Sequence, residues 1–466
     1  MNKSRPTSAR GMWLEYGLAF LILCGLLNTF VFFFSNGYLP QPWFYEPSGT
    51  FMDWYSLTIW AHKPGAFEVE RTIYPPLSFV IMRIFSFAEC YHYTRSEEVR
   101  SCDWVGVVFF TALLLVNAVL TFIVMVKLHG RRGWPRAFAL SFGLPMLYAY
   151  ERGNLVLLCY LNVLLAFGPL LRSARLRWLA AGFGVNLKVY LIAAVFAPLL
   201  RRRWIATEGM ILASVAVYFL TWAVLQDGSP QQLLRNLSDY SSGFSASAVL
   251  DLWYPATYIP LITLLKSDFP LNSIVDGRTA DTLALVVPLF IHATQGVILS
   301  AAVASWLRPE AVAPNRMVYL ALALALSASE AGGYTEILLL LFVFMEPWRG
   351  LPCKIAIVLA FVLCIPYDYV LGFLPGLLRT SYLSGRDVIA QYGVGVMSLL
   401  RPGLVLIIAN LLGGATIADV WRDIKQQGWQ GRWRFRGDWP LWPGARPPSP
   451  PTGQPLPARV EDRSSL

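Results

Sequence analysis

Long apolar stretches, several of them long enough to cross a lipid bilayer, constrain this chain more than any other feature. Residues 13–34 and 104–126 are almost free of charged side chains, and a helix needs about 20 apolar residues to cross the hydrocarbon core. The composition agrees, because 56% of the residues are hydrophobic and 14% are charged, against about 25% charged in an average soluble domain. We therefore expect an all-α polytopic membrane protein, which argues against soluble-enzyme and nucleic-acid-binding functions.

The formal net charge of +10 is interpreted as a topology signal, because Lys and Arg gather in the cytoplasmic loops of membrane proteins. Lys3, Arg5 and Arg10 precede the first stretch, which places the N-terminus in the cytoplasm, and no signal-peptidase site follows it. About 10–12 transmembrane helices or half-helices are expected. The predicted segments are residues 13–34, 104–126, 137–150, 155–171, 178–200, 210–225, 283–306, 317–328, 337–345, 355–371 and 388–412.

Residues 178–200 break the alternation of sides, because Arg clusters lie at both ends, in residues 172–177 and 201–203. A single crossing would leave one cluster outside. The middle of the stretch carries Asn186 and Lys188, and ten helical residues rise about 15 Å, half of the hydrocarbon core. We therefore predict two half-helices that turn near Lys188 and return to the same side, beside a cavity or inside the protein.

The chain divides into a membrane-embedded domain, residues 1–412, and a basic tail, residues 413–466. Residues 35–103 form a first external loop that is too long for a simple connector. The Pro-rich run at residues 447–451 favours extended, unpacked chain. We predict a disordered cytoplasmic tail, so that both termini lie inside, in the plasma (inner) membrane of a bacterium.

Polar side chains collect on the external side of this topology, where the positive-inside rule does not explain them. Charges within or beside membrane spans are costly, so each is a candidate for function. They come from separate hydrophobic hairpins, which predicts a site assembled at the outer membrane surface. The residues are Asp53, His62, Glu68, Glu70, Arg71, Glu151, Arg152, Asn154, Lys188 and Glu330.

Asp53 and Lys188 are the two charges with the clearest alternatives. Asp53 lies among the aromatic residues Phe51, Trp54 and Tyr55, and on the residues alone a solvated loop acid and a functional acid are equally good interpretations. Lys188 lies halfway through an apolar stretch and needs a counter-charge. That partner is either a protein carboxylate, Glu151 or Glu330, or an anionic ligand such as a lipid phosphate, which Lys binds well as a point charge. We favour the ligand.

The Glu-Arg-Gly-Asn run at residues 151–154 is explained most simply as a polar turn between two spans. As part of a site, Arg152 would contact phosphate, and Asn154 would order the loop or bind a sugar hydroxyl. Glu330 and Tyr334 have the same two interpretations.

Two cysteines, Cys90 and Cys102, lie in the first external loop. A disulfide is allowed on the external side, and two free thiols are the alternative, because the sequence does not give their geometry.

The order of these motifs resembles the polyprenol-phosphate-mannose-dependent mannosyltransferases of glycosyltransferase family 87, which belong to the C-type glycosyltransferase superfamily. The resemblance runs from residue 13 to about residue 412 and is best in residues 53–203. The motifs that carry it are Asp53 in the first external loop, Tyr-Pro-Pro at residues 74–76, Glu-Arg-Gly-Asn at residues 151–154 and Lys-Val-Tyr at residues 188–190.

The resemblance implies a C-type glycosyltransferase fold with its active site on the periplasmic or exterior face. It implies that Asp53 is the general base, and that Lys188, with Arg152 and Arg71, binds the donor phosphate. The remaining candidates, for the acceptor or the sugar, are Tyr74, Glu151, Asn154, Glu330, Tyr334 and His62.

The expected reaction moves a hexose from a polyprenyl-phosphate sugar to a glycolipid or glycan acceptor, as in polysaccharide biosynthesis. The resemblance implies mannose as the sugar, because mannose is the usual donor sugar of that family. A carboxylate can take the proton of the acceptor hydroxyl, and a lipid phosphate leaves readily when a cation holds its charge. No metal or cofactor is expected, and membrane lipids, not nucleic acid, are the expected surroundings. The alternatives are a flippase or transporter of a lipid-linked sugar and a structural partner in envelope assembly.

Overall fold

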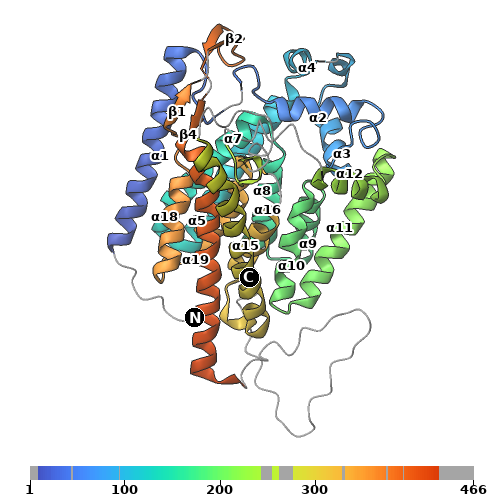
Figure 1. Cartoon of the computed structure of the whole chain (residues 1–466). Coiled ribbons are helices and arrows are strands. Elements are labelled where there is room, and N and C mark those ends of the chain that lie inside the picture. The colour runs from blue at the N-terminus through green and yellow to red at the C-terminus, as the bar shows by residue number, and fades with distance from the viewer. Residues whose placement is uncertain are drawn as a thin grey trace.

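The computed structural model describes residues 9–43, 46–93, 95–242, 254–261, 276–327, 331–373, 376–391 and 393–429. Within them the chain is predominantly helical, and most helices run along one bundle axis (Figure 1). Five helical stretches of the described chain are long and apolar enough to cross a membrane, which agrees with the expected all-α polytopic membrane protein. The long helices are α1 (Ala9–Asn36), α5 (Val105–His129), α11 (Trp204–Leu225), α15 (Gly277–Leu307) and α19 (Val396–Gln427).

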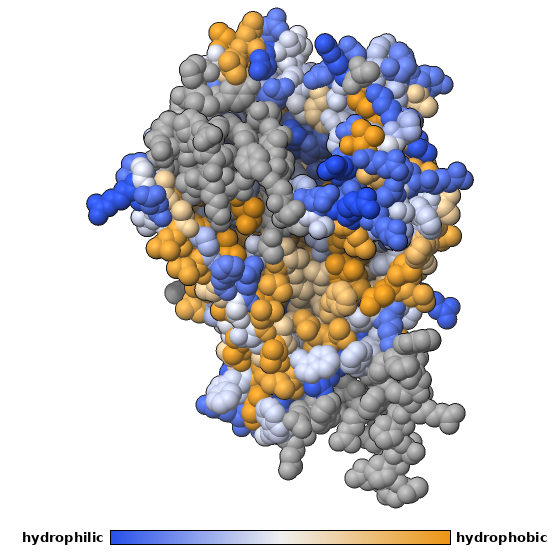
Figure 2. All heavy atoms as spheres, turned by 45° about the vertical axis from the view of Figure 1, so that its right-hand side comes forward, coloured by the Kyte–Doolittle hydropathy of each residue, from blue (hydrophilic) through white to orange (hydrophobic). Residues whose placement is uncertain are grey.

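On the face drawn in Figure 2, hydrophobic side chains predominate in the middle of the molecule and hydrophilic side chains predominate toward its two ends. On α1, for example, Phe20, Phe30 and Phe34 are exposed, as expected for side chains that face lipid. One end carries the segment between α1 and α5 and the strands, and we call it the loop end (Figure 1). The other, where α1 begins and α19 ends, is the opposite end (Figure 1).

Shorter helices fill the interior of the bundle. Helix α17 is buried along almost its whole length, as expected for a central helix that is hydrophobic all round. The predicted span 137–150 is two helices, α6 and α7, because the chain bends at Gly143 and Pro145 starts the second helix. These helices are α6 (Gly133–Phe142), α7 (Leu144–Arg152), α8 (Val156–Phe167), α9 (Ala174–Val185), α10 (Ile192–Leu200), α16 (Pro314–Ser327), α17 (Glu336–Met345) and α18 (Leu351–Leu363).

The predicted break near Lys188 is confirmed. Helix α9 ends at Val185, and after the turn a 3₁₀ helix, η3 (Val189–Leu191), leads into α10. Helices α9 and α11 pack in parallel, since Trp178 lies against Gly209 and Gly182 against Ala213. Because α9 and α11 run in the same direction, the chain must run back between them, and α10 is the helix that does so. The segment is therefore a hairpin whose turn points toward the loop end.

Small helices build the loop end. They are α2 (Met52–His62), α3 (Pro76–Ile84), η1 (Ala88–His92), α4 (Ser96–Cys102) and α12 (Pro230–Ser242), with η2 (Gly130–Arg132), η5 (Pro309–Ala311) and η6 (Gly333–Thr335) elsewhere in the chain. Helix α3 meets the hairpin turn through a hydrogen bond of 3.2 Å from Ser78 Oγ to Leu187 O.

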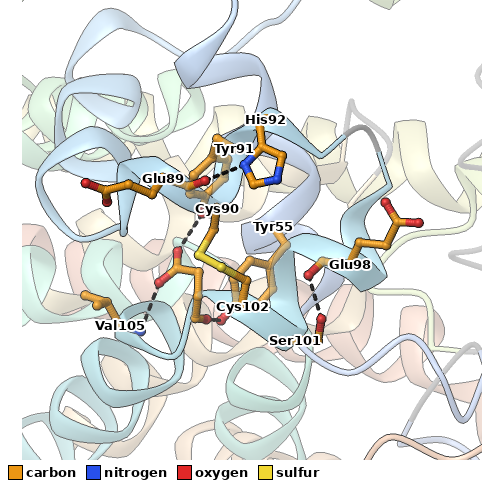
Figure 3. Close-up of a disulfide and its surroundings, with 10 residues drawn as sticks. Tyr55, Glu89, Cys90, Tyr91, His92, Glu98, Ser101, Cys102 and Val105 are labelled. Carbon is orange, nitrogen blue, oxygen red and sulfur yellow. Dashed lines mark hydrogen bonds between the residues drawn. A yellow bond between two sulfur atoms is a disulfide. The ribbon is translucent and has the colours of Figure 1, made fainter.

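A disulfide joins Cys90 and Cys102, which settles the alternative left open by the sequence (Figure 3). Next to it, Asp103 is fully buried and accepts hydrogen bonds from the Tyr91 hydroxyl at 2.7 Å and from the Val105 N–H at 3.0 Å. These contacts tie η1 and α4 to the start of α5.

Two predicted spans are wrong in their bounds. Residues 355–371 hold a helix only as far as Leu363, because Pro366 follows and disfavours helix in the residue before it. Residues 388–390 and 393–395 are strand, not helix, and α19 starts at Val396 and continues to Gln427, past the predicted end at residue 412. The two antiparallel pairs are β1 (Val370–Phe373) with β4 (Gly393–Gly395) and β2 (Leu377–Thr380) with β3 (Asp387–Ala390). The Pro-rich part of the tail lies outside the described residues.

Candidate functional site

Asp53 lies in the first turn of α2 and meets the turn between α7 and α8. Its carboxylate forms an ion pair with Arg152 and accepts a hydrogen bond of 2.7 Å from Asn154 Nδ2 on its other oxygen. The two side chains of the ion pair keep 19% and 15% of their surface exposed. Two motifs that the sequence analysis named separately thus form one unit, and that unit remains accessible.

The turn after Arg152 orients this unit through its backbone. Gly153 has φ +64°, a left-handed conformation that favours glycine, and a Cβ at this position would lie 3.1 Å from the Phe51 Cα. Asn154 Oδ1 accepts the Val156 N–H at 3.0 Å, next to the start of α8. Because its oxygen is engaged there, the amide nitrogen of Asn154 is directed toward Asp53.

A buried network holds the chain just before Asp53. Glu151 Oε1 accepts a hydrogen bond of 2.9 Å from the Thr50 hydroxyl, and the Phe51 N–H donates to Glu151 O at 2.7 Å. Arg100 of α4 donates to the carbonyl oxygens of Ser48, at 2.7 Å, and of Thr50. Arg100 and Thr50 were not predicted from the sequence, since neither lies in an apolar stretch where a polar residue would stand out.

Lys188 lies at the turn of the hairpin, between α9 and η3. Its Nζ donates a hydrogen bond of 2.8 Å to the Tyr74 hydroxyl, and it lies 4.5 Å from the Tyr74 ring centroid and 5.8 Å from that of Tyr334. Within the described part of the chain Lys188 has no carboxylate ion-pair partner. Glu151, one of its two expected partners, is bound to Thr50 instead, and Glu330 lies outside the described residues.

Aromatic residues connect the two charged centres. The Tyr334 ring stacks on Tyr148 of α7 with centroids 6.0 Å apart, and Tyr148 lies one turn before Arg152 on the same helix. The charges of Asp53 and Lys188 are themselves close enough to interact. Four segments that are distant in sequence therefore meet at this point: the segment between α1 and α5, the α7–α8 turn, the hairpin turn and η6.

Two further candidates have other partners in the described chain. Arg71 is largely exposed and pairs with Asp239 of α12 at 3.9 Å. The His62 ring stacks on Tyr91 at 4.2 Å, and its Nε2 lies 2.8 Å from Ser86 Oγ. Burial, together with the nearby Arg83, lowers the pKa of His62. The structure therefore does not bring Arg71 and His62 together with Asp53 and Lys188.

A second buried charged cluster was missed entirely. Arg401 of α19 lies 4.6 Å from the Tyr254 ring centroid and 3.9 Å from Asp368 Oδ2, and the Tyr254 hydroxyl donates to Glu336 Oε2 at 3.1 Å. All four side chains are buried. Glu336 and Arg401 border or interrupt apolar stretches, so the rule that flagged Lys188 would also have found them.

In the described residues, no group of three or more His, Cys, Asp or Glu side chains is placed to hold a metal ion. The chain matches no protein-family model, no curated protein and no solved structure. We therefore infer function from the geometry of Asp53 and Lys188 and from the resemblance of the motifs.

Proposed function

We propose that this protein is a membrane glycosyltransferase that moves a hexose, mannose first among them, from a polyprenyl-phosphate sugar to a glycolipid or glycan acceptor. The observation that carries the proposal is the pairing of an oriented carboxylate, Asp53, with a lysine, Lys188, that lacks a carboxylate partner among the described residues. The resemblance to family 87 and to the C-type superfamily supplies the donor class. The active site would face the exterior or periplasm.

Asp53 is suited to act as general base. Arg152 and Asn154 occupy one lone-pair direction on each oxygen, and a carboxylate has about four such directions. The acceptor hydroxyl gives its proton to Asp53 while its oxygen bonds to the anomeric carbon of the donor. The bond from that carbon to the phosphate oxygen breaks, and its electron pair leaves on the polyprenyl phosphate. This single displacement inverts the configuration at the anomeric carbon.

Lys188 is suited to hold the charge that develops on the leaving phosphate. A cation aimed at developing charge in a water-poor site stabilises the transition state more than it would in water. Tyr74 keeps the ammonium in place through its hydroxyl and ring. The guanidinium of Arg152 is already engaged with Asp53, so we assign Arg152 to positioning the base and leave the phosphate to Lys188.

The test is a transfer assay with purified protein, a short-chain polyprenyl-phosphate mannose and a panel of lipid and sugar acceptors, read by mass spectrometry. Asp53→Asn is expected to lower turnover by at least about 100-fold, the scale of a general base. The matched control is Asp387→Asn, because Asp387 is an exposed loop-end acid that bonds to Thr380. It is expected to keep wild-type turnover.

A second variant separates chemistry from folding, because Asp53→Asn leaves Arg152 without its ion pair. Asp53→Glu keeps a carboxylate but moves it by one methylene group, and a displacement of about 1 Å can cost about 100-fold in rate. Normal turnover in both variants would remove Asp53 from the mechanism. Movement of the sugar lipid across vesicles without any new glycosidic bond would favour the flippase.

A further inference from the structure

A second hollow lies at the loop end, away from the residues of the candidate site. It is a cavity of about 380 Å³ between α1, the chain at residues 38–41 and the chain that follows α18. This volume falls within the range of small-molecule sites, about 300–1,000 Å³. Asp53, Lys188 and their partners do not line it, so its occupant is a separate question.

Aromatic rings form much of its wall. Phe32 and Tyr38 meet edge to face with centroids 5.3 Å apart. Tyr367 and Tyr369 come from the segment after α18 and are largely exposed. Flat apolar rings bind the apolar faces of a ligand, while a few placed polar groups fix its orientation.

Three carboxamides supply those polar groups. Gln41 Oε1 accepts a hydrogen bond of 2.8 Å from the Gly393 N–H. The amide nitrogen of Gln41 is therefore the group that remains to donate to a ligand. That nitrogen is buried and has no hydrogen-bond partner in the described part of the chain. Asn28 lies on the exposed, lipid-facing surface of α1, one turn before Phe32, where a polar group is costly without a function. Gln391 is the third.

The cavity offers no exposed charge in its described lining. Asp368 belongs to the lining, but its side chain is 1% exposed, and it is engaged by the Met397 N–H at 2.9 Å and by Arg401. A phosphate site needs an exposed cation or a set of backbone N–H groups, and the described lining includes no Lys or Arg. A quaternary ammonium group is held by ring faces, whereas Phe32 and Tyr38 meet edge to face. Amides that both donate and accept fit hydroxyl groups.

The surroundings indicate that the ligand belongs to a lipid. The neighbouring surface of α1 exposes Phe30, Val31 and Phe34, which lie within one or two turns of Asn28 and would face acyl chains. We propose that this cavity binds the uncharged sugar head group of a membrane glycolipid, with its tails along α1. The binding site stands on the cavity alone and does not depend on the proposed transfer reaction.

Native mass spectrometry of the full-length protein released from nanodiscs tests this site. The discs contain equal amounts of a diacylglycerol with a single hexosyl head group and of the matching phosphatidylcholine. The wild type is expected to retain the hexosyl lipid at least about tenfold over phosphatidylcholine. Asn28→Leu and Gln41→Leu are each expected to reduce this preference about fivefold, the scale of one hydrogen bond.

Asn36→Leu is the matched control, because Asn36 is an exposed amide on the same helix that does not line the cavity, and it should keep the preference. Asp53→Asn should keep it too, so a failure of the transfer reaction leaves this result unaffected. If Gln41→Leu fails to fold, the lipid preference of the Asn28→Leu variant alone tests the proposal, because Asn28 is exposed. Equal retention of the two lipids, a preference for phosphatidylcholine, or a wild-type preference in Asn28→Leu would overturn the proposal.

Discussion

Ion pairs lie at both ends of the bundle, and two of them, Glu15–Arg136 and Asp53–Arg152, differ in how completely the protein encloses them. At the opposite end, Arg136 donates to both carboxylate oxygens of Glu15, at 2.8 and 2.9 Å, and to the carbonyl oxygens of Phe344 and Glu346. The side chains of that ion pair are 1% and 0% exposed. At the loop end, the Asp53–Arg152 pair is partly open, and Lys188 has a tyrosine hydroxyl in place of a carboxylate.

This difference distinguishes charged side chains whose hydrogen-bonding positions are filled by the protein from those that can still bind a ligand. Arg316 repeats the closed pattern, since it binds Glu346 at 2.6 Å and Asp419 at 2.7 Å. A buried guanidinium whose N–H groups are filled by the protein has nothing further to bind. The partly exposed Asp53–Arg152 pair, together with Lys188, which lacks a carboxylate partner among the described residues, is therefore the physical basis for placing the chemistry at this site.

The largest expected effect comes from breaking the closed pair. Arg136→Met leaves Glu15 fully buried without a counter-charge, and such a loss costs about 3–5 kcal/mol in the free energy of unfolding. The expected result is a large fall in the yield of folded protein and in the unfolding temperature, measured by thermal denaturation in detergent. Arg131→Met, at an exposed arginine of the same end, is the control and should unfold like the wild type.

The double variant Glu15→Leu with Arg136→Met sharpens this result. Replacing both partners of a buried ion pair with apolar side chains is often neutral in stability, so the double variant is expected to recover most of the loss. An Arg136→Met protein as stable as the wild type would contradict the structural role of the closed pair.

The disulfide is expected to have the next largest effect, and it acts at the loop end. It closes a loop with a sequence separation of 12 residues, and a loop of this size is worth about 3 kcal/mol in the chain-entropy view. Cys90→Ser with Cys102→Ser should loosen α4, and with it the Arg100 contacts to Ser48 and Thr50. Faster amide hydrogen exchange in residues 46–103 and a several-fold lower turnover are the expected results.

Cys24→Ser controls for the loss of a thiol, because Cys24 is a free, exposed cysteine on α1. Unchanged exchange in residues 46–103 of the double serine variant would show that the ion pairs and hydrogen bonds hold the loop without the disulfide.

The sequence predicted much of the fold because charge and apolar length are strong signals in a membrane protein. The Arg clusters on both sides of residues 178–200 predicted the hairpin, which the parallel packing of α9 and α11 confirms. The predicted span at residues 388–412 was wrong at its start, where residues 388–390 and 393–395 are strand, because apolar content alone does not distinguish helix from strand. The alternating exposure along β3, Asp387–Ala390, has the period of two that marks a strand.

The candidate site was predicted as a set of residues but not as a set of contacts. The sequence analysis named Asp53, Arg152 and Asn154, yet nothing in the sequence said that the last two hold the first. Arg152 was predicted to bind the donor phosphate, whereas in the structure its guanidinium forms an ion pair with Asp53. Glu15 lies inside the first predicted span, residues 13–34, and was not recognised as a buried charge that needs a partner. Contacts between distant segments depend on the packing of helices, which local patterns do not contain.

Lys188 gives the smallest effect on stability and the clearest contrast with Arg136. Lys188→Met removes a cation that has no carboxylate partner in the described chain and keeps the side-chain length. Because burying an unpaired charge is costly, the unfolding temperature is expected to stay the same or rise. Turnover should fall at least about tenfold, since the leaving phosphate loses its cation, and the donor KM is expected to rise with it.

The sign of the two stability changes decides whether the comparison of the two ends holds. Lys127→Met is the control, since Lys127 is an exposed lysine at the end of α5 that donates to Pro169 O at 2.8 Å, and it should leave turnover unchanged. If Lys188→Met destabilises the protein as strongly as Arg136→Met and leaves the donor KM unaltered, Lys188 is structural. Both ends of the bundle would then be closed, and the donor phosphate would need another cation.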